Sequence, residues 1–354
     1  MNHEEKIKLF QNVFAPKEGE RILILVDTPH HNIKDNEKWK DRRKMAQEWY
    51  NTFKELGDES DFIVEIQEYQ ATGIHNTPLP NSVIDKIITY NLVIAMTEFS
   101  ASSSLLLITQ SEKNQIRGAS MPLVEKRMET TAFTADYGLV QQYAASLKKI
   151  LDEAIGAKIF FSTDDTLFID LRNREGLSES GDCTKPGQCI NFPSGEACIA
   201  PYEAVTKERA AFGKSKTEGV WPVSYNGDLI KYKVKNNRIL EVIGEGVKAD
   251  EMRTFFNENE SRRNIAELGI GCNPNAVVTG NPLEDEKVGL HIAYGMSVHL
   301  GGKVESDTHI DIIHAKGCPI EGITLTLYYK DGTSIELIRN SQLRYNLLKK
   351  KDNY

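Results

Sequence analysis

Apolar positions in the first part of the chain alternate between short continuous runs and helical stripes. Residues 21–27 form a nearly continuous apolar run, which is typical of a strand covered on both faces. From Asp35 to Leu56 the apolar residues recur at helical spacing, and Gly57 predicts the end of that helix. Further elements are predicted at 61–66 (strand), 82–90 (helix) and 92–96 (strand). Repeated strand–helix units predict an α/β domain with a mostly parallel sheet.

The pattern changes after a helix that Asp136 is expected to cap and Gly156 to end. Beyond it, Asn226-Gly227 and Asp331-Gly332 each separate two alternating runs, which is a strong hairpin signal. The main helix of this part is expected at 249–256, continuing through 257–268. We therefore predict an α/β domain over residues 1–156 and a β-rich α+β domain over residues 157–354.

One alternating stretch of the second part carries polar side chains that could bind a metal ion. Polar and apolar residues alternate from Thr308 to Ile313, which predicts a β-strand. A period of two puts His309 and Asp311 on one face and Ile310 and Ile312 on the other. An imidazole and a carboxylate placed in this way can hold a metal ion or form a buried hydrogen-bonded pair.

Two glutamates and one more histidine lie among small and apolar residues. These are Glu196, Glu267 and His291. A buried carboxylate is costly unless it is paired or coordinates a metal ion. Together with His309 and Asp311 they make a nitrogen and oxygen donor set that suits Zn, Co or Mn. The alternatives are ion pairs with nearby arginines for the glutamates and a hydrogen-bonded core position for His291.

Bulk properties exclude several classes of protein. The net charge of −8 and the lack of a basic run interleaved with aromatic residues argue against nucleic-acid binding. Neither a signal peptide nor an apolar run of membrane-spanning length is evident, so no membrane association is expected. Five cysteines, an odd number, fit a reducing cytoplasm better than a disulfide framework. No G-x-G-x-x-G follows the first strand, so a dinucleotide-binding fold is rejected.

Four short motifs carry a family resemblance. In chain order they are SGEACIAPYE, AELGIGCNPNA, GLHIAYG and SDTHID. Their sequences and order resemble those of the M29 (thermophilic, aminopeptidase T-like) metallopeptidase family. The resemblance implies a two-metal aminopeptidase site, and the residues that match the family's ligands are Glu196, Glu267, His291, His309 and Asp311. It also implies a bridging role for Glu267, a peptide or small amide substrate and a homodimer.

The chain departs from the family at one position. Members of the family carry a tyrosine seven residues after the first ligand histidine, and Val298 stands there in this chain. Tyr294 and His299 are the nearby candidates for its catalytic role, alongside Glu267. The resemblance therefore predicts a metal-dependent hydrolase that removes N-terminal residues from short peptides, with two divalent ions (Zn, Co or Mn).

Two alternatives belong to other functional classes. The first is a mononuclear iron ring dioxygenase of the dihydroxypyridine type, for which His291, His309 and Asp311 would supply a two-histidine, one-carboxylate site. In that enzyme type a histidine stands at the position of Glu267, and the SGE-like segment lacks the glutamate. The second is a metal-binding homologue without catalytic activity, which the missing tyrosine would suit. The presence of both Glu196 and Glu267 favours the hydrolase.

Overall fold

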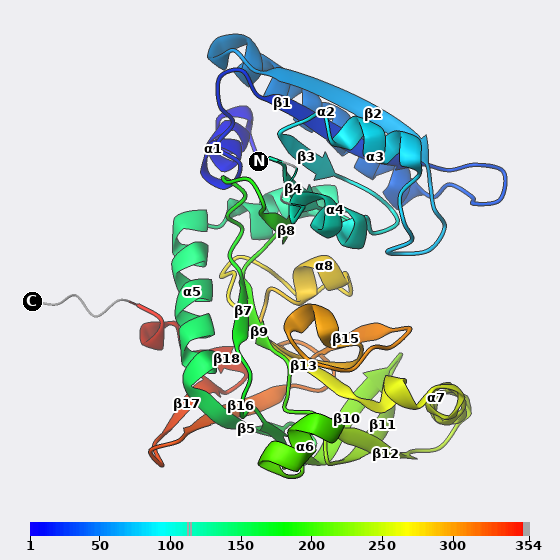
Figure 1. Cartoon of the computed structure of the whole chain (residues 1–354), viewed down its shortest axis with the longest axis vertical. Coiled ribbons are helices and arrows are strands. Elements are labelled where there is room, and N and C mark those ends of the chain that lie inside the picture. The colour runs from blue at the N-terminus through cyan, green and yellow to red at the C-terminus, as the bar shows by residue number, and fades with distance from the viewer. Residues whose placement is uncertain (112, 114, 350–354) are drawn as a thin grey trace, which may run out of the picture. The chain divides into compact units, whose positions relative to one another are not determined.

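The computed structural model describes residues 1–111, 113 and 115–349. It divides into two compact units (Figure 1). Unit 1 contains residues 1–141, 179–194 and 273–277, and unit 2 contains residues 142–178, 195–272 and 278–354, described to residue 349. The chain passes between the units several times, and the predicted domain division at residue 156 stays a prediction.

Unit 1 is built on a parallel sheet with the strand order β2-β1-β3-β4-β8. Its strands are β1 (Arg21–Thr28), β2 (Ile63–Gln70), β3 (Leu92–Ala95), β4 (Arg117–Ser120) and β8 (Cys189–Asn191). The helices are α1 (His3–Val13), α2 (Glu37–Ser60), α3 (Asn81–Ile87), α4 (Ser102–Thr109) and the short 3₁₀ segments η1 (Lys126–Thr130) and η2 (Ala132–Thr134). Residues 22–26 of β1 are fully enclosed, as the continuous apolar run predicted. The predicted α/β domain with a parallel sheet is therefore confirmed.

Unit 2 contains two sheets that share one apolar core. The first is an eight-stranded antiparallel sheet in the order β12-β11-β10-β6-β5-β16-β17-β18. Its strands are β5 (Ala154–Phe161), β6 (Thr166–Asp170), β10 (Glu218–Tyr225), β11 (Asp228–Lys235), β12 (Arg238–Ile243), β16 (Gly322–Tyr329), β17 (Ser334–Arg339) and β18 (Gln342–Leu343). The hairpins predicted at Asn226-Gly227 and Asp331-Gly332 join β10 to β11 and β16 to β17.

The second sheet of unit 2 has the strand order β15-β14-β13-β9-β7. Its strands are β7 (Gly176–Glu179), β9 (Glu196–Ile199), β13 (Ile265–Gly271), β14 (Leu290–Gly295) and β15 (His309–Ile313). The remaining elements of unit 2 are α6 (Thr206–Phe212), α7 (Val247–Glu258), η3 (Glu260–Arg263), α8 (Pro282–Asp285), η4 (Val298–Leu300) and η5 (Tyr345–Leu347). Helix α5 (Tyr137–Glu153) begins in unit 1 and continues into unit 2. The predicted β-rich character of the second part is confirmed.

Three local predictions need correction. Helix α2 continues past Gly57 to Ser60 and ends at Asp61, whose φ of 55° places it in the left-handed region. A Cβ on Gly57 would lie 2.6 Å from the Phe62 carbonyl oxygen, so this glycine permits a close approach within the helix. Helix α5 ends at Glu153, and Gly156 lies inside β5, where a Cβ would lie 2.4 Å from the Phe168 ring.

The third correction concerns residues 257–268, which were expected to extend a helix. Helix α7 ends at Glu258, a single 3₁₀ turn follows, and β13 begins at Ile265. Pairing of β13 with β9 on one side and β14 on the other provides two ladders of backbone hydrogen bonds. Tertiary pairing therefore overrides the local helical signal.

No helix in the described part of the chain combines the length and apolar character that crossing a lipid bilayer requires.

Candidate metal centre

All five predicted ligands lie on one face of the second sheet of unit 2. On β14, His291 pairs with Gly269 of β13, and Ala293 pairs both with Glu267 of β13 and with Asp311 of β15. The other ligands follow by register, because Glu196 pairs with Gly271 and His309 with Gly295. Residues paired across a sheet point to the same side, as do alternate residues along a strand. The sheet therefore gathers donors from four strands without help from any local sequence motif.

The opposite face of the same sheet is apolar. Its side chains belong to the core of unit 2 or pack against it: Ala197, Ile199, Leu268, Ile270, Ile292, Tyr294, Ile310 and Ile312. Each strand thus alternates between a core residue and a residue of the polar face. The predicted separation of His309 and Asp311 from their isoleucine neighbours is confirmed.

We call Glu196, Glu267, His291, His309 and Asp311 the carboxylate–histidine cluster. Its Asp311 half contains Glu267, His309 and Asp311, and each of them offers one ligand atom within 4.8 Å of the other two. His309 Nε2 lies 3.1 Å from Glu267 Oε2 and 3.5 Å from Asp311 Oδ1. These spacings match neighbouring donors around one small cation, because Zn–N and Zn–O bonds are about 2 Å long.

The Glu196 half shares Glu267 with the Asp311 half. His291 Nε2 lies 3.4 Å from Glu196 Oε2 and 3.4 Å from Glu267 Oε1. Glu267 thus presents one oxygen to each histidine. This arrangement suits a bridging carboxylate, which is the role that the family resemblance implies for Glu267.

The outer nitrogen of each cluster histidine is occupied by a backbone carbonyl. His309 Nδ1 lies 2.6 Å from the Met296 carbonyl oxygen, and His291 Nδ1 lies 3.3 Å from that of Gly289. An Nδ1–H that donates to a carbonyl leaves Nε2 as an acceptor in the neutral ring. Metal-binding histidines commonly have this outer hydrogen bond.

The two Nε2 atoms therefore face carboxylate oxygens, so acceptor meets acceptor. Glu196 Oε2 and Asp311 Oδ1 are also buried without a hydrogen-bond partner within the described chain. Such contacts are stable only with a positive charge between them, either a proton or a metal ion. The donor set fits a divalent cation for this reason.

The pKa values of His291, His309 and Glu267 also indicate that the cluster is stable only with bound positive charge. Burial favours the uncharged imidazole of His291, but hydrogen bonding with Glu267 and the charges of Glu196, Glu267 and Asp311 raise its pKa to about 10. Burial likewise opposes the shift at His309, yet Asp311 and Glu267 raise its pKa well above the usual range. Burial would raise the pKa of Glu267, but His291 and His309 hold it well below its usual range. A bound metal ion would take the place of the protons that these histidines otherwise hold.

Gly269 makes room for one of the donors. A Cβ at this position would lie 1.9 Å from His291 Nε2 and 2.3 Å from Cε1 of the same ring. The imidazole therefore crosses directly over the backbone of β13 to reach Glu267. In the sequence, a glycine inside a strand such as Gly269 is the one local signal of this close approach.

Lys287 is a further residue of the site that the sequence pattern does not predict. Its side chain is fully buried, and its Nζ lies 2.5 Å from Glu196 Oε1. The surrounding segment, PLEDEK, reads as a solvated helix end, so no signal in the sequence indicates a buried lysine.

The structure separates the two candidates for the missing tyrosine. His299 is exposed on η4, and its ring centroid lies 4.6 Å from that of His309 in an edge-on arrangement. Tyr294 lies on the apolar face of β14, where its ring packs 5.2 Å from Phe256 and 6.2 Å from Trp221. Burial, together with the neighbouring hydroxyl of Tyr225, raises the pKa of Tyr294 far above its usual range. His299 therefore borders the cluster, and the structure does not bring Tyr294 to it.

His314, another histidine of this region, belongs to the core. Its Nδ1–H donates to the Ile320 carbonyl at 3.1 Å, and its Nε2 accepts from Trp221 Nε1 at 2.8 Å. Burial lowers its pKa to about 4. Both ring nitrogens are satisfied in the neutral form, so no cation is needed.

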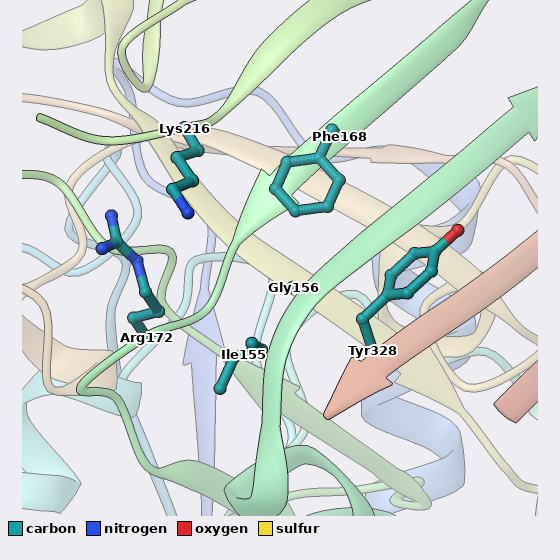
Figure 2. Close-up of a pocket in the computed structure, with 6 residues that line it drawn as sticks. All are labelled: Ile155, Gly156, Phe168, Arg172, Lys216 and Tyr328. Atoms are coloured by element: carbon teal, nitrogen blue, oxygen red, sulfur yellow. The ribbon is translucent and has the colours of Figure 1, made fainter. Parts of the chain in front are cut away.

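A separate cavity of about 250 Å³ lies on the eight-stranded sheet. Figure 2 shows the rings of Phe168 and Tyr328 on either side of the strand at Gly156, with Arg172 and Lys216 nearby. Arg172 is already paired with the buried Asp170. Within the described part of the chain, the residues lining this cavity include no member of the carboxylate–histidine cluster.

Comparisons with known proteins give a relationship at the level of fold. No known protein-family model matches the sequence, and no curated protein matches it. Among solved structures, 2,5-dihydroxypyridine dioxygenase from Pseudomonas putida KT2440 is similar, with a TM-score of 0.66 and 14% identity over 97% of this chain and 98% of that one. Wild-type AmpT from Thermus thermophilus is also similar, with a TM-score of 0.59 and 14% identity over 97% of this chain and 99% of that one. The chain thus shares its fold, over nearly its whole length, with both proteins.

Proposed function

We propose that this protein is a metal-dependent aminopeptidase that hydrolyses the N-terminal residue of short peptides at the carboxylate–histidine cluster. The observation that carries the proposal is the position of Glu267, whose two oxygens face the Nε2 atoms of His291 and His309 at 3.4 and 3.1 Å. The four motifs that resemble the M29 family supply these residues. AmpT from Thermus thermophilus has a similar fold, which is consistent with the same proposal.

The donor set divides into two possible ion positions. Glu267, His309 and Asp311 would hold one divalent ion, and Glu196 and His291 with the other oxygen of Glu267 offer a second set. A divalent cation held there would polarise a substrate carbonyl and lower the pKa of a water molecule. We take Zn, Co or Mn as the candidates, because these ions accept mixed nitrogen and oxygen donors.

The residues of the chain account for the orientation of the cluster. The carbonyl groups of Met296 and Gly289 fix the two imidazole rings through their Nδ1 atoms. Solvent reaches the cluster at its Asp311 half, where the side chains of His309 and Asp311 are 17% and 19% exposed. A partly open site rich in carboxylates attracts a cationic group, which suits the free amino terminus of a peptide.

His299 is the residue that we assign to proton transfer. Its imidazole is exposed and lies edge-on to His309, so it can reach a substrate group without being a member of the cluster. General acid–base catalysis by a histidine contributes about 10²- to 10⁴-fold to rate. His299 would then hold the proton that passes to the leaving amine at one of its ring nitrogens.

A dioxygenase is the second candidate, because 2,5-dihydroxypyridine dioxygenase has a similar fold. A two-histidine, one-carboxylate site needs only His291, His309 and Asp311. It would leave Glu196 and Glu267 as two further buried carboxylates beside the same ion. The hydrolase gives both glutamates a function, so we favour it.

One assay separates the two candidates. The purified protein, stripped with a chelator and reloaded with Zn, Co, Mn or Fe(II), is offered matched free-amino and N-acetylated peptides and 2,5-dihydroxypyridine while oxygen is monitored. We expect cleavage of the free-amino peptides only, dependent on added metal and without oxygen uptake. Oxygen uptake with the dihydroxypyridine, and no peptide cleavage with any metal, would refute the aminopeptidase.

The matched variants are Glu267→Gln in the cluster and Glu241→Gln on β12. The Glu241 side chain is 58% exposed and lies in a different sheet, so its substitution should leave cleavage unchanged. Equal cleavage by both variants would show that Glu267 is not part of the catalytic site.

A further inference from the structure

The Glu196 half of the carboxylate–histidine cluster contains a buried lysine. Lys287 Nζ lies 2.5 Å from Glu196 Oε1, and the lysine side chain is 0% exposed. Glu286 Oε2 also lies 3.3 Å from this ammonium, with a side chain that is 21% exposed. The Asp311 half has no lysine or arginine in ion-pair contact among the described residues.

The backbone holds Lys287 at this place. A Cβ on Gly271 would lie 2.3 Å from the Lys287 carbonyl carbon and 2.4 Å from the Glu286 carbonyl oxygen, so the lysine's main chain lies directly against the end of β13. Gly271 also donates its N–H to the Gly289 carbonyl at 2.8 Å and pairs with Glu196 in the sheet. The Lys287 N–H donates to the Glu284 carbonyl at 2.9 Å. The ammonium therefore reaches Glu196 from a fixed turn.

A buried ammonium at this position competes with a metal ion. Glu196 can bind a cation through either oxygen, and Lys287 already occupies Oε1. An ion at Glu196 Oε2 and His291 would stand close to the positive charge of Lys287, in a buried region where such repulsion is only weakly screened. The Asp311 half carries no such penalty.

The charges of the buried cluster lead to the same conclusion. Glu196, Glu267 and Asp311 carry three negative charges, and Lys287 carries one positive charge. One divalent ion balances the remaining two charges, whereas two divalent ions would leave an excess of positive charge among these residues. Buried unbalanced charge is costly.

We propose that Lys287 is the resident cation of the Glu196 half, so that the protein holds one divalent ion tightly at Glu267, His309 and Asp311 and a second ion only weakly. This inference rests on the metal site of the proposed function and specifies its stoichiometry. Lys287 acts as a positioning residue that fixes Glu196 and sets the order in which ions bind.

The test begins with the metal-free wild-type protein, titrated with Zn²⁺ by calorimetry and analysed for bound metal after gel filtration. We expect one equivalent to bind tightly and a second to bind about 10- to 100-fold more weakly, the range by which residues next to a metal site change affinity. Co²⁺ spectra recorded during the titration should change in two separate stages. Two equivalents that bind together with equal affinity would overturn the inference and leave the proposed metal site intact. No binding of either metal would overturn both.

Variants of Lys287 test the cause. Lys287→Met keeps the length of the side chain without its charge, and should retain two equivalents of Zn²⁺ after gel filtration. Lys287→Arg keeps the charge and should retain one. Thermal unfolding of the metal-free proteins shows whether each variant folds.

If Lys287→Met does not fold, the double variant Lys287→Met with Glu196→Gln removes both charges, and it should bind a single ion as tightly as the wild type. One retained equivalent in a folded Lys287→Met, or a tight site lost from the double variant, would contradict the proposal.

Discussion

Unit 2 contains two kinds of buried histidine, and their hydrogen bonds explain why one kind suggests a metal site. His314 donates to a carbonyl through Nδ1 and accepts from Trp221 through Nε2, so the neutral ring is fully satisfied. His291 and His309 also use Nδ1 for a carbonyl, but their Nε2 atoms face carboxylates. His291 and His314 are equally buried, so the partner of Nε2 makes the difference. A hydrogen-bond donor at Nε2 satisfies the neutral ring within the core. A carboxylate acceptor at Nε2 requires a cation, either a proton or a metal ion.

The pKa values follow this division. Burial lowers the pKa of His314 to about 4, because its neighbours provide no compensating charge. The same burial acts on His291, yet the carboxylates around it raise its pKa to about 10. His314 and His291 are both buried in unit 2, yet their pKa values differ strongly. The substitutions that follow test the carboxylate–histidine cluster on one side and the apolar core on the other.

Substitution of Glu267 should have the largest effect. Glu267→Gln removes the negative charge shared by His291 and His309 and replaces one oxygen by an amide donor, so one half of the cluster loses a ligand and the other keeps only a neutral amide oxygen. We expect peptide cleavage to fall by at least about 10³-fold, within the range seen when groups central to catalysis are removed. Steady-state kinetics and metal analysis of the same preparation measure the two losses. Cleavage within a factor of about ten of the wild type would show that Glu267 is not central.

Substitutions on β15 should remove metal from the Asp311 half. His309→Ala and Asp311→Ala each delete a donor that faces Glu267, and we expect Zn²⁺ affinity at the tight site to fall by at least about 100-fold, the upper end of the effect of outer residues. Competition with a chromophoric chelator gives the affinity. Ile312→Ala on the opposite face of the same strand is the control, because it trims the core and leaves every donor in place. Equal loss of affinity in the control would attribute the effect to disruption of β15.

The sequence predicted the β15 side of the site well, because a period of two depends only on the local backbone. His309 and Asp311 share a face for that reason, and the isoleucines between and beside them pack against the core. The parallel sheet of unit 1 was equally accessible, since a continuous apolar run such as 22–26 reports burial on both faces. These features need no knowledge of distant contacts.

The remaining parts of the site depend on contacts that the sequence does not encode locally. Glu267 was expected at the end of a helix, and only pairing with β9 and β14 makes its segment a strand. Lys287 lies in an acidic stretch that reads as solvated, yet the turn beside Gly271 brings it to Glu196. Tyr294 was chosen for its closeness in sequence to the missing tyrosine, but the register of β14 points it to the core.

The histidine of the core should affect stability through pH and leave the metal site unchanged. The unfolded chain binds a proton at His314 near the usual pKa of 6.5, whereas the folded chain does so only near pH 4. The unfolded state therefore gains protons first as the pH falls, and stability decreases through this window. From these two pKa values we expect a loss of about 2 kcal/mol in the free energy of unfolding between about pH 7 and about pH 5.

His314→Gln isolates this contribution, because a glutamine at this position does not titrate. Denaturant unfolding at both pH values should show a fall that is about 2 kcal/mol smaller in the variant than in the wild type. Zn²⁺ affinity at neutral pH is the companion measurement and should be unchanged. An identical pH dependence in the two proteins would show that folding does not lower the pKa of His314.

Tyr294 gives the smallest expected effect, and it decides between the two residues once considered for the missing tyrosine. Its ring contacts Phe255, Phe256 and Trp221 on the apolar face, so a hydroxyl there cannot act at the donors on the other side of the sheet. Tyr294→Phe removes only the hydroxyl beside Tyr225, and we expect the free energy of unfolding to fall by at most about 1 kcal/mol, the usual net value of one hydrogen bond. Its kcat should stay within about twofold of the wild type, whereas His299→Ala at the edge of the cluster should lower kcat by at least about 10²-fold. Kinetics of the two variants on one free-amino peptide make the comparison. A large loss of kcat in Tyr294→Phe, with full activity in His299→Ala, would reverse the assignment and show that β14 can turn its tyrosine towards the substrate.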